Sequence, residues 1–352
     1  SFPIMATIRH RLLIFLLLPL LAVSINPVPS LLDSDFEDMA DPAVLEHDGT
    51  LYIYPTSDQS NFYAHYANIE PGKAPSEFNF KRTPEPVFSS EDANKGCPWI
   101  KLIPALGKGS LTWAPHVSYH EPTKTFYMYF SICLQMYVAT SSTPLGPFTE
   151  PKLLETLAID PMLFEDDDGS LYLYYSNIDL MKYFNGEESI YVQKMKSPTE
   201  KDETYSARQL LKPSEDWEFP RSSIIAPRGI NEGPWMYKRD GVYNLMYSGA
   251  GADTQFYNIG TATSLTPDGT FVKVETNPIS DPQSPPDVGI YGPGHHSIWE
   301  DGDGKPWVIY HQQKSDDNGW GRDLCIDPLT ISGDGKMSIK YTKEAGMTRG
   351  DE

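Results

Sequence analysis

The chain has 352 residues, of which 12% are aromatic, and it shows no long heptad or 3.6-residue period after its N-terminus, which argues against a helical bundle and favours an all-β fold. Its formal net charge of −20 repels nucleic-acid phosphates and anionic lipid, which argues against both as partners. A neutral substrate or a bound cation is compatible with this charge.

The first 24 residues have the pattern of a secretory signal peptide. Arg9-His10-Arg11 precede an apolar run of 12 residues, Leu12 to Val23, and Ala22-Val23-Ser24 supply small residues for cleavage. Such a run is too short to span a bilayer but suits the core of a signal peptide. We therefore expect residues 1–24 to be a signal peptide, residues 25–352 to be a single catalytic domain, and the protein to be secreted. A membrane anchor or an uncleaved tail is the alternative.

Three cysteines, Cys97, Cys133 and Cys325, are placed irregularly along the chain. Extracellular thiols tend to pair, so secretion predicts at most one disulfide within this chain. The spacing does not decide which two residues form it, and three buried thiols are the alternative.

Five copies of one hairpin pattern follow in chain order. Each copy has a short apolar strand, a turn rich in polar residues, and an aromatic strand with period-2 alternation. Their spacing leaves room in each unit for a four-stranded sheet, and such units pack around an axis as a β-propeller. We therefore expect a five-bladed β-propeller, with a β-sandwich as the weaker alternative. The copies are "DPAVLEHDGTLYIYPTSD" from Asp41, "WAPHVSYHEPTKTFYMYFS" from Trp113, "DPMLFEDDDGSLYLYYSN" from Asp160, "EGPWMYKRDGVYNLMYSG" from Glu232 and "GHHSIWEDGDGKPWVIYHQQ" from Gly294.

One residue at the start of each copy lies at a similar distance before the aromatic residue that marks the second strand. The separation is 11 residues for Asp41 and Glu232, 12 for Asp160 and His295, and 14 for Trp113. Equivalent positions of successive blades meet at the propeller axis. The pattern therefore predicts that these five side chains converge at one mouth of a central channel.

Three carboxyl groups, an indole and an imidazole at one place suit carbohydrate chemistry. Two carboxyl groups that flank a glycosidic bond hydrolyse it when one protonates the leaving oxygen and the other activates water. Clustering raises the pKa of one of them, because like charges close together resist ionising together. An indole offers a flat apolar face to a sugar ring, so Trp113 is a candidate sugar platform, with a place in the core as the alternative.

The chain resembles glycoside hydrolase family 43 over nearly its whole length after the signal peptide. The resemblance implies a five-bladed propeller that cleaves arabinofuranosidic or xylosidic bonds of plant cell-wall polysaccharides with inversion, and it implies no cofactor for the chemistry. It also implies that Asp41 is the general base, Glu232 the general acid, and Asp160 the residue that orients the acid and tunes its pKa. The motifs are Asp41-Pro42, Trp113-Ala114-Pro115, Asp160-Pro161, Glu232-Gly233-Pro234 and Gly292-Pro293-Gly294-His295, each ahead of its hairpin.

Three further positions are interpreted through this resemblance. His295 matches a central-channel histidine that in many members helps to hold a structural calcium ion, with hydrogen bonding or substrate contact as the alternative; its neighbour His296 leaves the choice open. Arg322, in "GWGRDLCID", resembles an arginine that some members place near the sugar pocket, with an ordinary strand-edge charge as the alternative. The sequence departs from the family pattern after Trp-Ala-Pro, where an acid is usual and this chain has His116.

The preferred expectation is a secreted α-L-arabinofuranosidase, ahead of a β-xylosidase or an endo-α-1,5-arabinanase, and it rests on the overall resemblance alone. The related five-bladed fructosidases use Trp-Met-Asn-Asp-Pro-Asn-like and Glu-Cys motifs, whereas this chain reads "DMADPAV" and "NEGPW". A non-catalytic carbohydrate-binding propeller would lose the acids, and all three are present. The expected partner is an arabinose- or xylose-containing carbohydrate, and neither nucleic acid nor a membrane.

Overall fold

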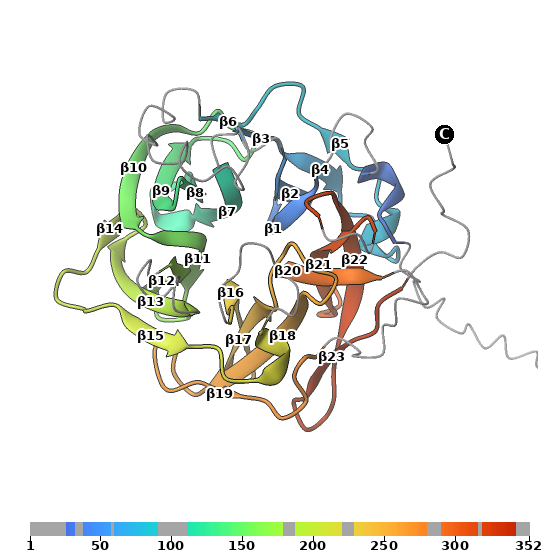
Figure 1. Ribbon diagram of the computed structural model, residues 1–352. Helices are drawn as coiled ribbons and strands as arrows, with labels where there is room; N and C mark the ends of the chain where they lie inside the picture. Colours follow the sequence, from blue (N-terminus) through green and yellow to red (C-terminus); the bar gives the residue numbers. More distant parts are fainter. Residues whose placement is uncertain are drawn as a thin grey trace, which may run out of the picture.

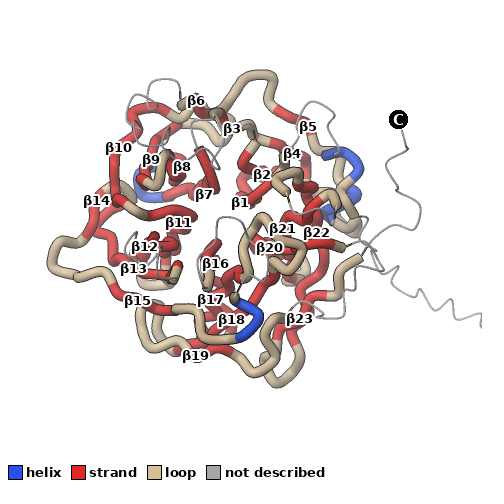
Figure 2. Tube along the Cα trace, viewed as in Figure 1, coloured by secondary structure: helices blue, strands red, loops and turns tan. Residues whose placement is uncertain are grey.

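The computed structural model describes residues 26–31, 38–57, 60–90, 112–178, 187–219, 229–279, 290–315 and 319–342. Their regular structure is almost all β-strand, arranged as five sheets around one axis (Figures 1 and 2). The predicted five-bladed β-propeller is thus confirmed. The predicted signal peptide, residues 1–24, falls outside the described residues. Within the described ranges, none of the helices has the length and apolar character needed to cross a membrane.

Each blade is an antiparallel sheet whose strands follow one another outward from the axis (Figure 1). Blade I contains β1 (Ala40–His47), β2 (Thr50–Thr56), β4 (His65–Asn68) and β5 (Lys81–Arg82). Blade II contains β7 (Thr112–His120), β8 (Thr125–Ile132), β9 (Gln135–Ser141) and β10 (Thr149–Thr156). Blade III contains β11 (Ala158–Glu165), β12 (Leu171–Ile178), β13 (Glu188–Ser197), β14 (Glu200–Lys201) and β15 (Arg208–Leu211).

Blades IV and V repeat the arrangement. Blade IV contains β16 (Glu232–Arg239), β17 (Val242–Gly249), β18 (Asn258–Ser264) and β19 (Val272–Lys273). Blade V contains β20 (Tyr291–Glu300), β21 (Pro306–Gln313), β22 (Arg322–Ile331) and β23 (Met337–Ile339). The remaining elements are a two-stranded sheet, β3 (Asn61–Phe62) with β6 (Phe88–Ser89), and the short 3-10 helices η1 (Pro29–Leu31), η2 (Pro75–Glu77), η6 (Glu121–Thr123) and η7 (Asp216–Glu218).

The core is divided among the faces between adjacent blades. In β2, Leu51 and Ile53 pack toward blade V, whereas Tyr52 and Tyr54 pack toward blade II. This alternation follows from the period of two in a strand, and it explains why the second strand of each blade reads as apolar or aromatic on both faces. Burying both faces requires a neighbour on each side, which is what a closed ring of blades provides.

Three buried tyrosines make the same contact from one blade to the next. The Tyr54, Tyr129 and Tyr174 hydroxyls donate to backbone carbonyls at 2.8, 2.8 and 2.6 Å. The acceptors belong to prolines in the outer turns of the following blade, and a tyrosine buried in this way needs such a partner for its hydroxyl. The acceptor carbonyls are those of Pro144, Pro198 and Pro267.

The ring is closed by an N-terminal clasp, residues 26–31 and 38–39, which binds to β22 of blade V. The Val28 and Met39 N–H groups donate to backbone carbonyls of β22 at 3.1 and 3.0 Å. The Asn26 side chain donates to the Ile326 carbonyl at 3.1 Å and accepts from the Ile326 N–H at 2.8 Å. The segment that leads into blade I is therefore held by the last blade.

The cysteines differ in state. Cys133, between β8 and β9, is disulfide-bonded. Cys325, in β22, is a buried thiol. Cys97 falls outside the described residues, so Cys133 is the member of the predicted disulfide that the structure identifies.

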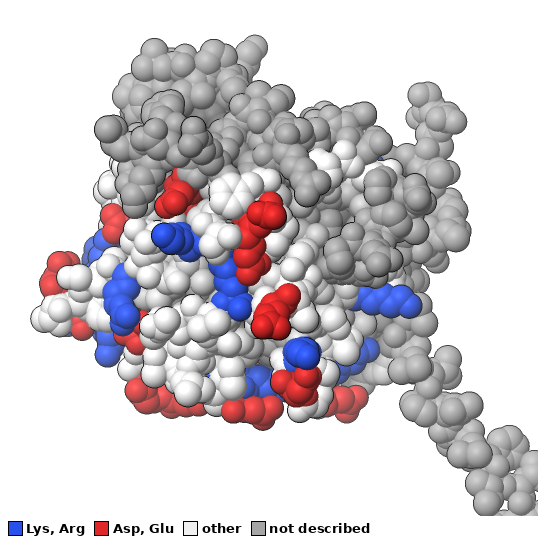
Figure 3. All heavy atoms as spheres, turned by 60° about the horizontal axis from the view of Figure 1, so that its bottom comes forward, with Lys and Arg blue, Asp and Glu red and all other residues white. Residues whose placement is uncertain are grey.

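Charged side chains of both signs are interspersed over the face of the molecule shown in Figure 3. Several form exposed pairs, such as that of Lys196 with Glu200 at 3.8 Å. Exposed pairs of this kind contribute little to the free energy of folding. This face is therefore an ordinary solvated surface.

Candidate active site

The inner strand of every blade begins with the same backbone irregularity. One residue there has a positive φ, and the pairing with the second strand shifts register around it. A β-bulge of this kind re-aims side chains, and a positive φ costs a residue with a side chain about 1 kcal/mol or more. Its recurrence around one axis therefore marks a functional position. The five residues are Asp41 (φ 47°), Ala114 (φ 45°), Asp160 (φ 55°), Gly233 (φ 56°) and His295 (φ 43°).

The spacing predicted that Trp113 and Glu232 occupy the same position in their blades as Asp41, Asp160 and His295. This prediction is wrong by one residue. The bulge residues of blades II and IV are Ala114 and Gly233, so Trp113 and Glu232 lie one position before them. The error arises because the turns between inner and second strands differ in length, so that counting back from an aromatic residue does not fix the phase. The two residues nonetheless have different surroundings: a carboxylate oxygen of Glu232 lies within 4.8 Å of one of Asp160, whereas Trp113 packs against apolar residues.

Asp41 lies among imidazoles and a guanidinium. Its Oδ1 is 3.1 Å from His295 Nδ1 and 3.7 Å from Arg322 Nη1. Its backbone N–H donates to His311 Nδ1 at 3.1 Å, which makes that nitrogen an acceptor. Burial raises the pKa of Asp41, but the neighbouring His295 and Arg322 outweigh it and lower the pKa to about 2. Asp41 is therefore an ionised carboxylate at neutral pH.

Asp160, Glu188 and Glu232 form an acidic cluster opposite Asp41. One carboxylate oxygen of each lies within 4.8 Å of the other two, and all three side chains are buried. The Asp160 carboxylate accepts from the Gly233 N–H at 3.0 Å and from the Ser176 hydroxyl at 3.3 Å.

Both Asp160 and Glu232 hold protons tightly. Burial raises the pKa of Asp160 to about 7, with His295 opposing the shift and Glu232 adding to it. Burial also raises the pKa of Glu232 to about 7, with Tyr257 opposing and Asp41 adding. The site thus combines one carboxyl that is ionised near pH 7 with two that are in part protonated.

A small cavity of about 20 Å³ lies beside Asp41 and Asp160, and neither Glu188 nor Glu232 is among the residues that line it. That volume is room for about one water molecule. Two of its walls are the buried imidazoles of His116 and His296, whose ring nitrogens find no hydrogen-bond partner among the described residues. Burial lowers their pKa values to about 4 and about 3, so both rings are neutral at neutral pH. Its lining also includes Asp41, Asp160, Trp235 and His295.

The structure places the two candidate substrate-binding residues differently. Arg322 is buried, and its Nε and Nη2 donate to the two carboxylate oxygens of Asp38 at 2.9 and 2.6 Å, while Nη1 faces Asp41. Trp113 is half-buried and packs against Ile159 and its apolar neighbours, and it is not among the residues that line the cavity.

The family model for glycosyl hydrolases family 43 matches residues 37–337, a range that contains every site residue described above. The chain belongs to glycoside hydrolase family 43. This family 43 enzyme is 27% identical over 340 residues to a xylosidase/arabinosidase of Bacteroides ovatus, with 85% of this chain and 94% of the relative covered. It is 24% identical over 320 residues to a β-D-galactofuranosidase of Aspergillus niger, covering 85% and 81%. A thermostable family-43 glycoside hydrolase of known crystal structure matches at 29% identity with a TM-score of 0.72, covering 88% of this chain and 95% of that one.

This family 43 enzyme brings together five of the six predicted site residues and adds others that the motifs did not indicate. Asp41 contacts both His295 and Arg322, and a carboxylate oxygen of Asp160 lies within 4.8 Å of one of Glu232. Glu188 was missed because it opens the third strand of blade III, away from any motif. Its alternation with the buried Ile190 and Val192 is the signal that it faces inward. Asp38, Tyr257 and His311 were missed as well.

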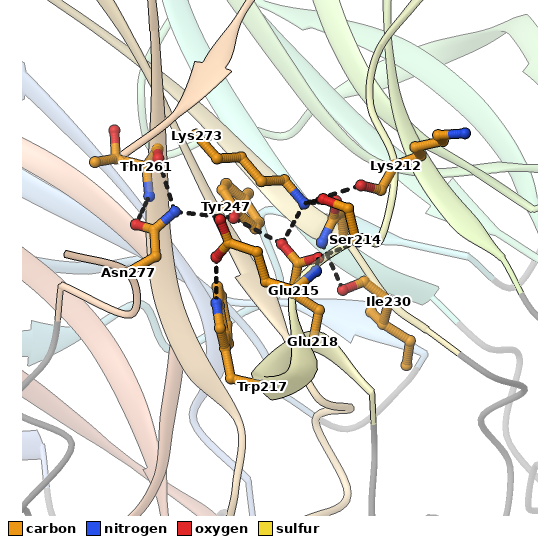
Figure 4. Close-up of polar contacts among 11 residues, drawn as sticks. Lys212, Ser214, Glu215, Trp217, Glu218, Ile230, Tyr247, Thr261, Lys273 and Asn277 are labelled. Carbon is orange, nitrogen blue, oxygen red and sulfur yellow. Dashed lines mark hydrogen bonds and ion pairs between the residues drawn. The ribbon is translucent and has the colours of Figure 1, made fainter. Parts of the chain in front are cut away.

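A network of hydrogen bonds and an ion pair around Glu218 and Lys273 supports the segment that precedes Glu232 (Figure 4). Glu218 is 0% exposed; it accepts from the Tyr247 hydroxyl at 2.7 Å and pairs with Lys273. The Lys273 ammonium also donates to the Asn231 side-chain oxygen at 3.1 Å. The residue that precedes Glu232 is therefore fixed to a buried ion pair.

Proposed function

We propose that this enzyme is a secreted, inverting α-L-arabinofuranosidase that acts on arabinose-containing plant polysaccharides or oligosaccharides. The observation that supports it best is the pairing of two buried carboxyl groups that influence each other's charge, with Asp41 held ionised and Glu232 able to hold a proton. Secretion is proposed from the signal-peptide pattern of residues 1–24.

In the proposed mechanism, the Asp41 carboxylate accepts a proton from a water molecule as that water attacks the anomeric carbon. The protonated Glu232 gives its proton to the glycosidic oxygen as the bond to that carbon breaks. One attack by water inverts the anomeric configuration, and no covalent sugar–enzyme bond forms. Asp160 orients Glu232 through its hydrogen bond to the next residue's backbone. Trp113 and Arg322 remain proposals for sugar contacts, the latter from its place beside Asp41.

The names of two relatives bear on the choice of sugar. The Bacteroides relative is named for both xylosidase and arabinosidase activity, which keeps β-xylosidase as the second candidate. The Aspergillus relative is named for a galactofuranoside. Arabinofuranose and galactofuranose are both five-membered-ring sugars, and this favours a furanoside for the present enzyme.

A structural calcium ion near His295 also remains a proposal. Calcium takes six to eight oxygen ligands at about 2.3–2.6 Å, whereas the cavity of about 20 Å³ is lined by two carboxyl groups, three imidazoles and otherwise mostly apolar side chains. The channel would have to widen to hold a hydrated calcium ion, so no step of the mechanism is routed through one. Activity and melting temperature before and after chelation with EDTA test the proposal.

The decisive experiment compares wild type with Glu232→Gln on nitrophenyl α-L-arabinofuranoside, β-D-xylopyranoside and β-D-galactofuranoside. We expect the arabinofuranoside to be the best substrate, and we expect the variant to lose about 10²- to 10⁴-fold in kcat/KM on natural oligosaccharides. Glu200→Gln, on the exposed β14, is the matched control. Equal rates for Glu232→Gln and wild type on arabino-oligosaccharides, whose leaving group needs a proton, would refute the assigned acid, and NMR detection of a retained anomer would refute inversion.

A further inference from the structure

Glu188 is a buried acid for which the described residues supply no cation. Its side chain is 4% exposed, yet its Oε1 has no hydrogen-bond partner among the described residues. Glu218, which is also buried, shows the contrast: backbone and side-chain donors and the Lys273 ammonium surround its carboxylate. A buried ionised carboxylate without donors costs several kcal/mol of folding free energy. We therefore infer that Glu218 is ionised and that Glu188 is protonated.

The backbone holds Glu188 opposite the general acid. The Glu188 N–H donates to the Gly229 carbonyl at 3.1 Å, and the Asn231 N–H donates to the Glu188 carbonyl at 3.0 Å. These bonds fix the first residue of β13 against the segment that enters β16 at Glu232. The backbone positions from which the two carboxyl groups extend are therefore fixed by main-chain contacts.

The charges around Glu188 are negative. Asp160 of β11 and Glu232 of β16 face it, and these, together with burial, raise the pKa of Glu188 well above its ordinary value. Asp160 has the Gly233 N–H and the Ser176 hydroxyl as donors, so it bears a charge more easily. Around Glu232 lie Tyr257, Asp41, Asp253 and Arg322, and beside Asp160 lies His295. Glu188 is the member of the cluster that keeps its proton longest.

We propose that Glu188 is a positioning residue that remains a neutral carboxylic acid and donates its O–H to the Glu232 carboxylate that forms when the general acid has given up its proton. The inference rests on the proposed role of Glu232. Glu188 keeps its own proton throughout turnover, so no bond to it forms or breaks. Its donated hydrogen bond stabilises ionised Glu232, which makes Glu232 a stronger acid toward poor leaving groups.

The protonation state has a test that needs no substrate. The infrared difference between wild type and Glu188→Gln at about pH 8, where Asp160 and Glu232 are mostly ionised, should contain a protonated-carboxyl stretching band from wild type. Asp327→Asn is the control: Asp327 is also buried, but the Tyr310 hydroxyl donates to its carboxylate at 2.8 Å, so its difference spectrum should lack the band. Absence of the band for Glu188 would overturn the proposal, whatever the enzyme's substrate.

Kinetics test the action on Glu232. Glu188→Met removes the donor at nearly the same length and should lower kcat/KM about 10- to 100-fold for arabino-oligosaccharides, whose leaving group needs a proton. It should have little effect on a dinitrophenyl arabinofuranoside, whose leaving group needs none. It should also move the alkaline limb of kcat/KM to higher pH by about one unit, because ionised Glu232 loses a donor.

Glu188→Gln is the conservative rescue, since the amide is neutral and still donates. Compared with Glu188→Met, it should have the alkaline limb of kcat/KM at the wild-type pH and most of the wild-type activity on oligosaccharides. Equal losses on both classes of leaving group, or an unmoved limb in Glu188→Met, would show a merely structural role and overturn the proposal. If Glu188→Met does not fold, the infrared result for Glu188→Gln decides by itself. Failure of the Glu232→Gln experiment would refute the proposed acid without changing the infrared band.

Discussion

The backbone N–H of Gly233 donates to the Oδ2 of Asp160 at 3.0 Å, so the residue that follows Glu232 is tied to the inner strand of the preceding blade. Gly233 has a φ of 56°, and a Cβ at this position would meet the His295 ring at 3.3 Å. Glycine there lets three blades approach the axis at one point. The orientation of Glu232 thus depends on a contact between blades.

The contact predicts different results for two substitutions of Asp160. Asp160→Asn keeps an oxygen that accepts the Gly233 N–H, whereas Asp160→Ala leaves that N–H without its acceptor. We expect Asp160→Ala to lower kcat about 100-fold, because a small misplacement of a catalytic group costs that much, and Asp160→Asn to lower it less. Steady-state kinetics on arabino-oligosaccharides would show the difference. Equal losses in the two variants would contradict the orienting role.

The pH profile of kcat/KM should be bell-shaped. The proposed mechanism needs Asp41 ionised, which holds above its pKa of about 2, and Glu232 protonated, which holds below its pKa of about 7. Activity should therefore rise above about pH 2 and fall as the pH passes about 7. Initial rates over that range on stable enzyme measure both limbs. A rate that keeps rising above pH 8 would contradict the assignment of the acid.

Arg322 should set the acid limb. Its guanidinium helps to lower the pKa of Asp41, so Arg322→Met should raise that pKa and move the acid limb to higher pH by about one unit. The variant also leaves Asp38 without its bidentate partner. The double variant Arg322→Met, Asp38→Asn is the control. It should recover stability, because no buried carboxylate is left unpaired, but its acid limb should stay at the higher pH. An unchanged acid limb in Arg322→Met would rule out this effect.

Stability should depend on pH through Glu232. Its pKa rises from an ordinary 4.5 to about 7 in the folded protein, so the folded state binds the proton more tightly. The stabilisation is complete below about pH 4.5 and is lost as the pH rises toward 7. Glu232→Gln should therefore be more stable than wild type at pH 8, by a few kcal/mol, and nearly equal to it at pH 4. Thermal unfolding at both pH values gives the comparison, with Glu200→Gln as control. If the stability difference between Glu232→Gln and wild type were the same at pH 4 and pH 8, the raised pKa of Glu232 would be contradicted.

The Glu218–Lys273 pair should behave as a buried ion pair. Lys273→Met leaves the Glu218 carboxylate buried without its cation, and we expect a loss of about 3–5 kcal/mol in unfolding free energy. The double variant Glu218→Met, Lys273→Met should lose less, since no charge remains uncompensated. Urea unfolding of four proteins, the wild type, Glu218→Met, Lys273→Met and the double variant, forms a double-mutant cycle. Additive losses would mean that the two side chains do not interact.

Much of the fold was predictable from the sequence because each blade repeats its own local signals. The alternating strands and the polar turns recur five times, and their number and spacing indicate the propeller before any contact is known. The acids Asp41 and Asp160 follow from the same repeat. The one-residue error at Glu232 shows the limit of the method, since a bulge is a backbone feature and the turn lengths that hide it vary between blades.

Glu188 and Asp38 were not predictable for a different reason. Each acts through a neighbour from another blade or from the N-terminal clasp: Glu188 through Glu232, and Asp38 through Arg322. Contacts between residues so far apart in sequence leave no local pattern. A buried acid inside an apolar strand pattern is the one sign available, and it identifies the position without identifying its partner.

Because of the N-terminal clasp, we expect the individual blades of this enzyme to fold before blades I and V join. Asn26 and Ile326 are separated by 300 residues, whereas the strand pairs within a blade are local. Each blade can form its meander as it leaves the ribosome, but the interface between blades I and V closes only when both ends of the chain are present. Until then Trp307 and Ile53, which meet in that interface, face water. Ring closure is therefore the step at which we expect folding to be slowest and aggregation to compete.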